Sequence, residues 1–234
     1  MKLYENIIIG NFLYGLGFSL GRTFGTNSPP SVINLLQQTP ADKTLGDLLV
    51  EYPGVVRLIE FKNKSSSKTK EKSKIEILDK AIGGQKELRK VSHDIHWYIE
   101  TSPKRKECIN RIVPYLHAFN SIESRYTLES YINEITKSVI GEKTDFDSSL
   151  VKSYLYLVAQ SFDEGNVGTG GLIFSVNSTG IRYVQYTDIT QLNLQCKELV
   201  NQLREEQQSI MTKQVKNEKS LSSTRERRLG RGIS

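Results

Sequence analysis

The sequence of 234 residues contains only two cysteines, Cys108 and Cys196, which excludes a small domain cross-linked by several disulfides. Such sparing use of cysteine is typical of proteins from a reducing compartment. No apolar run reaches the ~18 to 20 residues that a membrane-spanning helix needs. We therefore expect a cytoplasmic protein that has no membrane partner.

The N-terminal stretch lacks the features of a secretory signal. Lys2 precedes an apolar segment, but Glu5, Asn6 and Asn11 interrupt that segment, and no small-residue cleavage site follows it. Its apolar residues recur at helical spacing instead. We expect residues 3–20 to form a buried amphipathic helix.

The charge of the chain is unevenly placed. Hydrophobic residues make up 37% and charged residues 25%, which suits one globular domain, or one domain with an appendage, and excludes a disordered chain. Of the net charge of +6, residues 61–74 carry +5 (six Lys, one Glu) and residues 213–234 carry +5 (seven Lys or Arg, two Glu). Such segments attract polyanions, nucleic acid among them. Solvated surface without a ligand is the alternative interpretation.

Hydrophobic periodicity predicts an α/β fold. Residues 44–64 predict two strands around Pro53-Gly54, and the second, VVRLIEF, is apolar enough to be buried on both faces. Residues 65–74 are mostly Ser and Lys and predict a mobile loop. Further helices are expected over 30–38, 75–91, 107–120, 128–140, 147–162 and 188–210, a strand over 95–100, a glycine-rich loop over 164–171 and a second hairpin over 172–186.

This order of elements divides the chain into three expected parts. Residues 1–102 form a core of helix, β-hairpin, helix and strand. Residues 103–212 form a mostly helical half that contains the second hairpin and binds substrate or a partner, or mediates dimerisation. Residues 213–234 form a disordered basic tail, since they lack apolar periodicity.

The first hairpin brings charged residues together at one end. Symmetric pairing about Pro53-Gly54 places Asp47 opposite Glu60, and Lys62 emerges two residues later on the same face. Carboxylates at such short range repel unless one holds a proton or a cation lies between them. Their oxygens suit Mg²⁺ or Mn²⁺. A cation there, with the ammonium group of Lys62, can activate water and stabilise a phosphate during phosphodiester hydrolysis.

The order helix, hairpin, helix, strand, with Asp47 before Glu60-Phe61-Lys62, resembles the PD-(D/E)xK nuclease superfamily and its restriction-endonuclease-like fold. The resemblance covers roughly residues 3–100. It implies a metal-dependent endonuclease in which Asp47 and Glu60 bind Mg²⁺ or Mn²⁺ and Lys62 assists the nucleophile. It also implies that Glu5, near the start of the first helix, completes the catalytic and metal site.

Nucleic acid, with DNA preferred over RNA, is the substrate that the resemblance implies. The lysine-rich loop leaves the motif strand directly, so we expect it to follow the substrate backbone. Gln85 is a candidate contact from the next helix, and His93 with His96 is a weaker candidate for a zinc pair. The residues expected to contact nucleic acid are Lys64, Lys68, Lys70, Lys72, Lys74, Lys104, Arg105 and Lys106.

The biological setting follows by analogy alone. Paired cuts in duplex DNA favour a homodimer, and the toxicity of an unrestrained nuclease favours a regulatory protein partner. Small nucleases of this kind serve in antiviral defence or mobile-element systems. The alternative hypothesis is a non-catalytic nuclease-like module that binds nucleic acid or a partner protein, in which the charged trio is a surface ion pair.

Overall fold

The computed structural model describes most of the first 186 residues. The expected helix over 188–210, the basic tail over 213–234 and the turn at Pro53-Gly54 lie outside the described residues. Contacts divide the chain into the units Met1–Asn193 and Leu194–Ser234, and every described residue belongs to the first. The described ranges are 4–25, 31–36, 46–52, 55–103, 108–124, 126–141, 147–162, 171–177 and 180–186.

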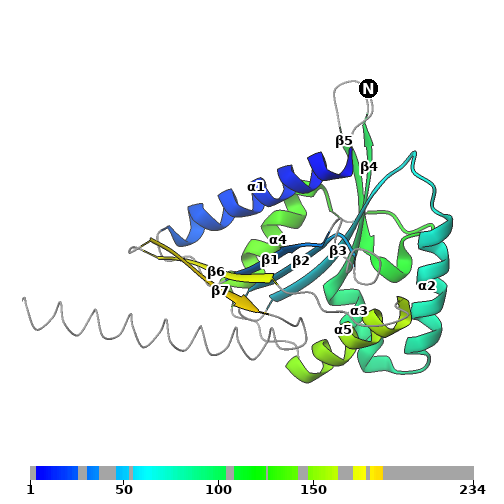
Figure 1. Ribbon diagram of the computed structural model, residues 1–234. Coiled ribbons are helices and arrows are strands. Elements are labelled where there is room, and N and C mark those ends of the chain that lie inside the picture. The colour runs from blue at the N-terminus through cyan, green and yellow to red at the C-terminus, as the bar shows by residue number, and fades with distance from the viewer. Residues whose placement is uncertain are drawn as a thin grey trace, which may run out of the picture. The chain divides into compact units, whose positions relative to one another are not determined.

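A mixed sheet of seven strands, in the order β5-β4-β3-β2-β1-β6-β7, forms the centre of this unit (Figure 1). Neighbouring strands are antiparallel except β3 and β4, which run parallel. The strands are β1 (Ser31–Leu35), β2 (Leu48–Tyr52), β3 (Val55–Asn63), β4 (His96–Pro103), β5 (Cys108–Pro114), β6 (Gly171–Asn177) and β7 (Gly180–Tyr186).

Five α-helices of the described residues cover the sheet, so the fold is mixed α/β. Helices α1 and α4 pack against each other and against β3, while α3 contacts β3, β4 and β5 and lies against α5 (Figure 1). The helices are α1 (Glu5–Phe24), α2 (Thr69–Ile82), α3 (Lys86–Ile95), α4 (Leu128–Ile140) and α5 (Ser148–Phe162), and η2 (Tyr115–His117) is a short 3₁₀ turn.

The side chains of β3 point alternately to the two faces of the sheet, and their contacts show which helices lie on each face. Ile59 and Phe61 belong to the apolar core that also contains Phe12 and Leu16 of α1 and Tyr131 of α4. Successive side chains on a strand point to opposite faces. Glu60 and Lys62 therefore point to the other face, away from α1 and α4.

On the second face of the sheet, α3 packs against β4 and its neighbours, and α5 packs against α3. His96 pairs with Leu58 of β3, so it lies on the same face as Glu60. Its Nδ1 lies 2.7 Å from the hydroxyl oxygen of Tyr154 in α5, and that hydroxyl also contacts Ser92 of α3. The charged end of the hairpin therefore lies on the face that these helices share.

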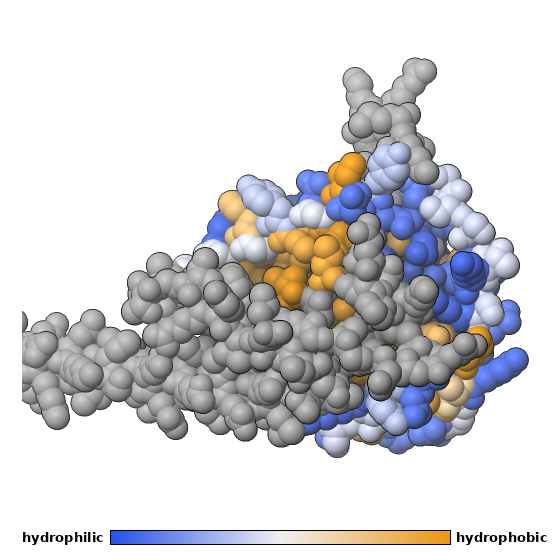
Figure 2. Space-filling view, in the orientation of Figure 1, coloured by the Kyte–Doolittle hydropathy of each residue, from blue (hydrophilic) through white to orange (hydrophobic). Residues whose placement is uncertain are grey.

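Exposed apolar residues remain beside α1. The β1 side chains Ile33 and Leu35 are exposed and share the face of α1, because they pair with Val50 and Leu48 of the apolar core. Figure 2 shows apolar surface next to α1 in the same orientation. Among the described residues, no helix has the length and apolar content needed to cross a lipid bilayer.

The expected helix over 30–38 is wrong, because residues Ser31–Leu35 form strand β1. Val32 and Ile33 are β-branched and favour extended backbone. Pairing with β2 on one side and β6 on the other provides hydrogen-bond partners that a local sequence pattern does not reveal.

The expected helix over 107–120 is also wrong. Strand β5 (Cys108–Pro114) occupies its first half and pairs with β4 over seven residues, and the 3₁₀ turn η2 follows. The half of the chain after residue 103 is consequently not mostly helical in its described part, since it contains β5, β6 and β7 beside α4 and α5. These elements join the sheet and layers formed by residues 1–102 and do not make a separate unit.

The helices between β3 and β4 also have other bounds than expected. Helix α2 begins at Thr69, inside the stretch 65–74 that was expected to be a loop. The single helix expected over 75–91 is two helices, because α2 ends at Ile82 and is followed by Gly83, whose φ of 53° few other residues adopt.

Several predictions of the sequence are confirmed. The structure has α4 over Leu128–Ile140, α5 over Ser148–Phe162 and a hairpin of β6 and β7. Strand β4 contains the expected strand over 95–100 apart from its first residue and continues to Pro103. The N-terminal helix is α1, buried along one side.

Candidate active site

The hairpin of β2 and β3 has the register that symmetric pairing predicts. Asp47, which directly precedes β2, donates its backbone N–H to the carbonyl of Ile59 at 3.1 Å, so the regular pairing ends at Leu48 and Asp47 lies next to the residue that precedes Glu60. The observed pairs are Tyr52 with Val55, Glu51 with Val56, Val50 with Arg57, Leu49 with Leu58 and Leu48 with Ile59.

Asp47 is fixed by the backbone of the motif strand. Its Oδ2 accepts a hydrogen bond of 2.6 Å from the backbone N–H of Phe61, and its side chain is almost fully buried. The carboxylate of Asp47 is therefore held beside the segment Glu60-Phe61-Lys62.

Gly46 lets the chain pass close to the carboxylate of Glu60. Its φ is 136°, a conformation that L residues rarely adopt, and a Cβ at this position would lie 3.4 Å from Glu60 Oε2. Proline, which the resembled family has before its aspartate, fixes φ near −65° and does not fit this backbone. The glycine is thus a requirement of the local geometry.

Glu60 and Lys62 form the ion pair at the centre of the site. Lys62 Nζ lies 2.6 Å from Glu60 Oε1, and only 3% of Glu60 is exposed. Burial and the charges of Asp47 and Glu71 raise the pKa of Glu60 well above its ordinary value, against the opposing effect of Lys62 and Lys74. Lys62 and Lys74 therefore offset only part of the effect that burial and the neighbouring acids have on the pKa of Glu60.

The same charges act on Lys62. Burial works to lower the pKa of Lys62, but the ion pair with Glu60 and the charges of Asp47 and Glu5 raise it above its ordinary value. The three acids and the lysine that the sequence predicted as a site are thus within electrostatic reach of one another.

Glu5 reaches this end of the sheet from the first residue of α1. Its Oε1 accepts hydrogen bonds from the backbone N–H of Asn63, at 2.9 Å, and from the hydroxyl of Ser66, at 3.3 Å. These contacts tie the start of α1 to the end of β3. They place Glu5 beside the motif, as predicted, although its oxygen is occupied by donors of the chain itself.

The sequence did not predict Glu71, a buried acid of α2. The residue is 4% exposed, and its Oε1 accepts a hydrogen bond from the hydroxyl of Tyr115. Glu71 is the single acid of a lysine-rich run whose composition predicts a loop, and a loop residue is not expected to be buried. The spacing from Glu71 to Leu78 and Ile82 is a helical one, and it was the available signal that all three share a buried face.

The lysines expected to contact nucleic acid lie around the start of α2, where the surface is predominantly hydrophilic (Figure 2). Lys64 and Lys70 are exposed. Lys68 forms an ion pair with Glu100 of β4. Lys68, Lys70 and Lys72 lie at the N-cap and in the first turn of α2, where the helix dipole favours anions and therefore opposes their positive charge.

Two of these lysines also pack on aromatic rings. Lys72 Nζ lies 5.5 Å from the ring centre of Phe119, and Lys74 Nζ lies 5.6 Å from that of Phe162. The remaining predicted contacts, residues 104–106, lie outside the described residues.

Gln85 is not brought to the site. It is exposed and follows the C-terminal end of α2, whereas Glu71 lies in the first turn. A helix rises about 1.5 Å per residue, so the two residues are roughly 20 Å apart along α2.

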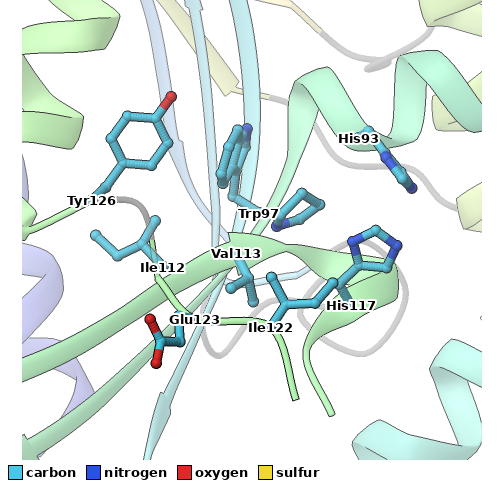
Figure 3. A pocket seen from close by; sticks show the side chains of 9 residues that line it. His93, Trp97, Ile112, Val113, His117, Ile122, Glu123 and Tyr126 are labelled. Carbon is cyan, nitrogen blue, oxygen red and sulfur yellow. The ribbon is translucent and has the colours of Figure 1, made fainter. Parts of the chain in front are cut away.

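The histidines do not form the zinc pair that the sequence offered as a weaker candidate. His96 is buried, which lowers its pKa to about 3, and it contacts Tyr154. His93 instead faces His117, with ring centres 4.4 Å apart, beside a pocket of about 270 Å³ that also contains Trp97 (Figure 3). The two residues therefore occupy different environments.

The carboxylate oxygens at the end of the hairpin are the type of ligand that a hard cation such as Mg²⁺ prefers. Mg²⁺ is commonly held by one or two protein carboxylates, with water and substrate phosphate as its other ligands, and Asp47 and Glu60 provide such a pair. Within the described residues, no three His, Cys, Asp or Glu side chains lie close enough to enclose a metal ion by themselves. Glu60 contacts Lys62 instead.

Comparisons with known proteins add no assignment to this geometry. No protein family, curated protein or solved structure matches the chain.

Proposed function

We propose that the chain is a metal-dependent nuclease with the restriction-endonuclease-like core of the PD-(D/E)xK superfamily. One observation carries the proposal: backbone hydrogen bonds that join Asp47 to Ile59 and Phe61 hold it beside Glu60, and Lys62 lies 2.6 Å from Glu60 at a buried end of the same strand. The order helix, hairpin, helix, strand around this trio supports the proposed core.

The chemistry assigned to the site is hydrolysis of a phosphodiester. Asp47 and Glu60 would hold Mg²⁺ or Mn²⁺, which when bound supplies Lewis-acid activation of water and phosphate. Lys62 directs its ammonium group to the same spot and can orient the attacking water or neutralise charge on phosphate. The water oxygen bonds to phosphorus as the bond to the departing sugar oxygen breaks, and that oxygen receives a proton. Glu5 fixes the end of β3 on which Lys62 stands.

The proposed substrate is nucleic acid, with DNA preferred over RNA because of the resemblance. The exposed Lys64 and Lys70, near the start of α2, support this choice because their positive charge attracts phosphate. A homodimer or a regulatory protein partner, a cytoplasmic location and a role in antiviral defence or a mobile element complete the proposal by analogy.

Cleavage assays with plasmid, linear duplex, single-stranded DNA and RNA test the proposal. We expect cleavage in Mg²⁺ or Mn²⁺ that EDTA abolishes. Glu60→Gln and Lys62→Ala should each lower the cleavage rate at least about hundredfold while binding is retained. Lys80→Ala, at an exposed position far along α2, is the matched control and should cleave as the wild type does.

Other outcomes separate the competing hypotheses. Cleavage that persists in both variants would place the active site elsewhere. Binding with a steep dependence on salt but no cleavage by any protein would favour the non-catalytic nucleic-acid-binding module.

A further inference from the structure

A pocket separate from the hairpin acids lies beside the start of β4 (Figure 3). Its volume is about 270 Å³, and four aromatic side chains line it, those of His93, Trp97, His117 and Tyr126. None of its described lining residues belongs to the candidate active site. Pockets with aromatic and apolar walls and a few polar groups are the usual form of a small-molecule site. This pocket is therefore a second candidate binding site.

The indole ring of Trp97 is held in place from two sides. Its Nε1–H donates a hydrogen bond of 3.0 Å to the backbone carbonyl of Asp94 in α3. The ring also packs on Tyr126 and Tyr131, with ring centres 5.8 Å and 5.0 Å away. Part of its surface nevertheless stays exposed. The indole is thus a fixed platform on which a flat ligand can stack.

Arg111 of β5 fixes the segment 117–122, which supplies two further lining residues. Its guanidinium group donates hydrogen bonds to four backbone carbonyls, those of His117, Ala118, Asn120 and Ile122. The hydroxyl of Ser124 continues this attachment, because it accepts the backbone N–H of Ile112 at 2.9 Å and donates to the carbonyl of Tyr126 at 2.7 Å. Walls that are fixed before a ligand arrives lose less entropy when it binds.

His93 brings an unused hydrogen-bonding group to the pocket. Its Nε2 is buried and has no hydrogen-bond partner among the described residues. Burial, with the charges of His117 and Arg89, lowers the pKa of His93 against the opposing effect of Asp94. The imidazole is therefore neutral at pH 7, and a buried nitrogen without a partner is unfavourable until a ligand pairs with it.

These features select a small, flat and uncharged ring system with a polar edge. No lysine or arginine is among the described residues that line the pocket, so the lining offers a phosphate no counter-charge. Its volume is at the lower end of ligand pockets, which start at roughly 300 Å³, and suits a single ring system. A nucleobase has both a face that stacks on aromatic side chains and an edge of hydrogen-bond donors and acceptors.

We infer that this pocket binds a nucleobase, which stacks on Trp97 and forms a hydrogen bond with His93. The base belongs either to a free nucleoside or to an unpaired nucleotide of a single strand, since the chemistry that the pocket recognises is the same. The inference goes beyond the proposed function and does not rest on it, because binding here needs neither a metal ion nor cleavage.

Trp97 is the only tryptophan of the chain, so the intrinsic tryptophan fluorescence of the full protein reports on this pocket. The test titrates the protein in EDTA with adenosine, guanosine, cytidine and thymidine, and calorimetry measures the affinities. We expect saturable quenching by at least one nucleoside and none by ribose 5-phosphate, which lacks a base. Quenching by tetramethylammonium but by no nucleoside would overturn the inference and identify a site for organic cations.

Two variants test the assigned contacts. His93→Ala removes the unpaired nitrogen and Tyr126→Leu removes a ring beside Trp97, and each should weaken nucleoside binding about tenfold. Tyr156→Leu is the matched control, because it removes an exposed tyrosine of α5 and should leave the affinity unchanged. Circular dichroism shows whether each variant is folded, and alanine favours the helix in which His93 lies. If folded His93→Ala and the wild type bind nucleosides equally, the inference is overturned.

Oligonucleotides distinguish the two sources of the base. A single strand that quenches Trp97 at lower concentration than the nucleosides, while the same strand with abasic sites does not, identifies a base of nucleic acid as the ligand. Quenching by nucleosides alone identifies a free nucleoside. Equal quenching by the intact and the abasic strand, with none by nucleosides, would overturn the inference. Each result is obtained in EDTA and is thus independent of whether the protein cleaves nucleic acid.

Discussion

Replacing Gly46 by alanine should destabilise the fold and disturb the candidate site together. The φ of 136° at Gly46 lies in a region that is essentially restricted to glycine, and an L residue there costs roughly 2 kcal/mol. The new Cβ would lie 3.4 Å from Glu60 Oε2 and 3.5 Å from the carbonyl oxygen of Ile59, so relaxation of this strain would shift the carboxylate. For a chain of this size, the melting temperature should fall by roughly 4 to 8 °C.

Differential scanning calorimetry in EDTA measures this change, and a Mn²⁺ titration measures the effect on the site. Gly10→Ala is the matched control, because Gly10 is exposed in the middle of α1 and a Cβ there meets nothing within 4 Å. That variant should gain about 0.5 to 1 kcal/mol from the higher helix propensity of alanine. Should Gly46→Ala melt at the wild-type temperature and bind Mn²⁺ equally well, the reasoning about this backbone position is refuted.

Two further predictions concern charges on β2 and α2. Burial, opposed by Lys152, raises the pKa of Glu51 from 4.5 to about 7. The free energy of unfolding should therefore fall by up to about 3 kcal/mol as the pH rises from 4.5 to 7. Urea titrations at pH 5 and pH 8 should show Glu51→Gln more stabilising at pH 8, and equal effects would contradict the assignment. Replacing both Lys64 and Lys70 by glutamine should lower the salt slope of DNA binding by about 2, and an unchanged slope would exclude phosphate contacts.

The parts of the fold that the sequence predicts are those with strong local patterns. Helices α4 and α5 have apolar residues at helical spacing, and the two hairpins have β-branched runs flanking turn residues. The register of β2 and β3 was predictable because a short turn fixes which residues face each other. The local sequence was therefore enough to predict a helix or a hairpin whose pattern lies within its own residues.

The strands β1 and β5 were missed because pairing with other strands determines them. β1 gains hydrogen bonds from β2 and from the distant β6, and β5 gains them from β4, the strand before it in the chain. Residues 30–38 and 107–120 also have apolar residues that satisfy helical spacing. Tertiary pairing overrode that local preference.

The candidate site was predicted as far as its residues share one hairpin and the start of one helix. Asp47, Glu60 and Lys62 follow from the register, and Glu5 from the resemblance. Glu71 could not follow from the register, because a helix packed against the sheet brings it there. A contact of that kind depends on where α2 begins and on the orientation of its buried face.

The two faces of β3 balance buried charge in different ways. On the face toward α4, the buried Arg57 pairs with Glu134 at 3.2 Å, so one cation meets one anion. On the opposite face, Lys62 pairs with Glu60, and the buried Glu71 has a tyrosine hydroxyl as its partner. A buried one-to-one pair is sufficiently explained by structure, since either partner alone would be destabilising. The same reasoning applies to Glu60, whose removal would leave Lys62 without the carboxylate that it contacts.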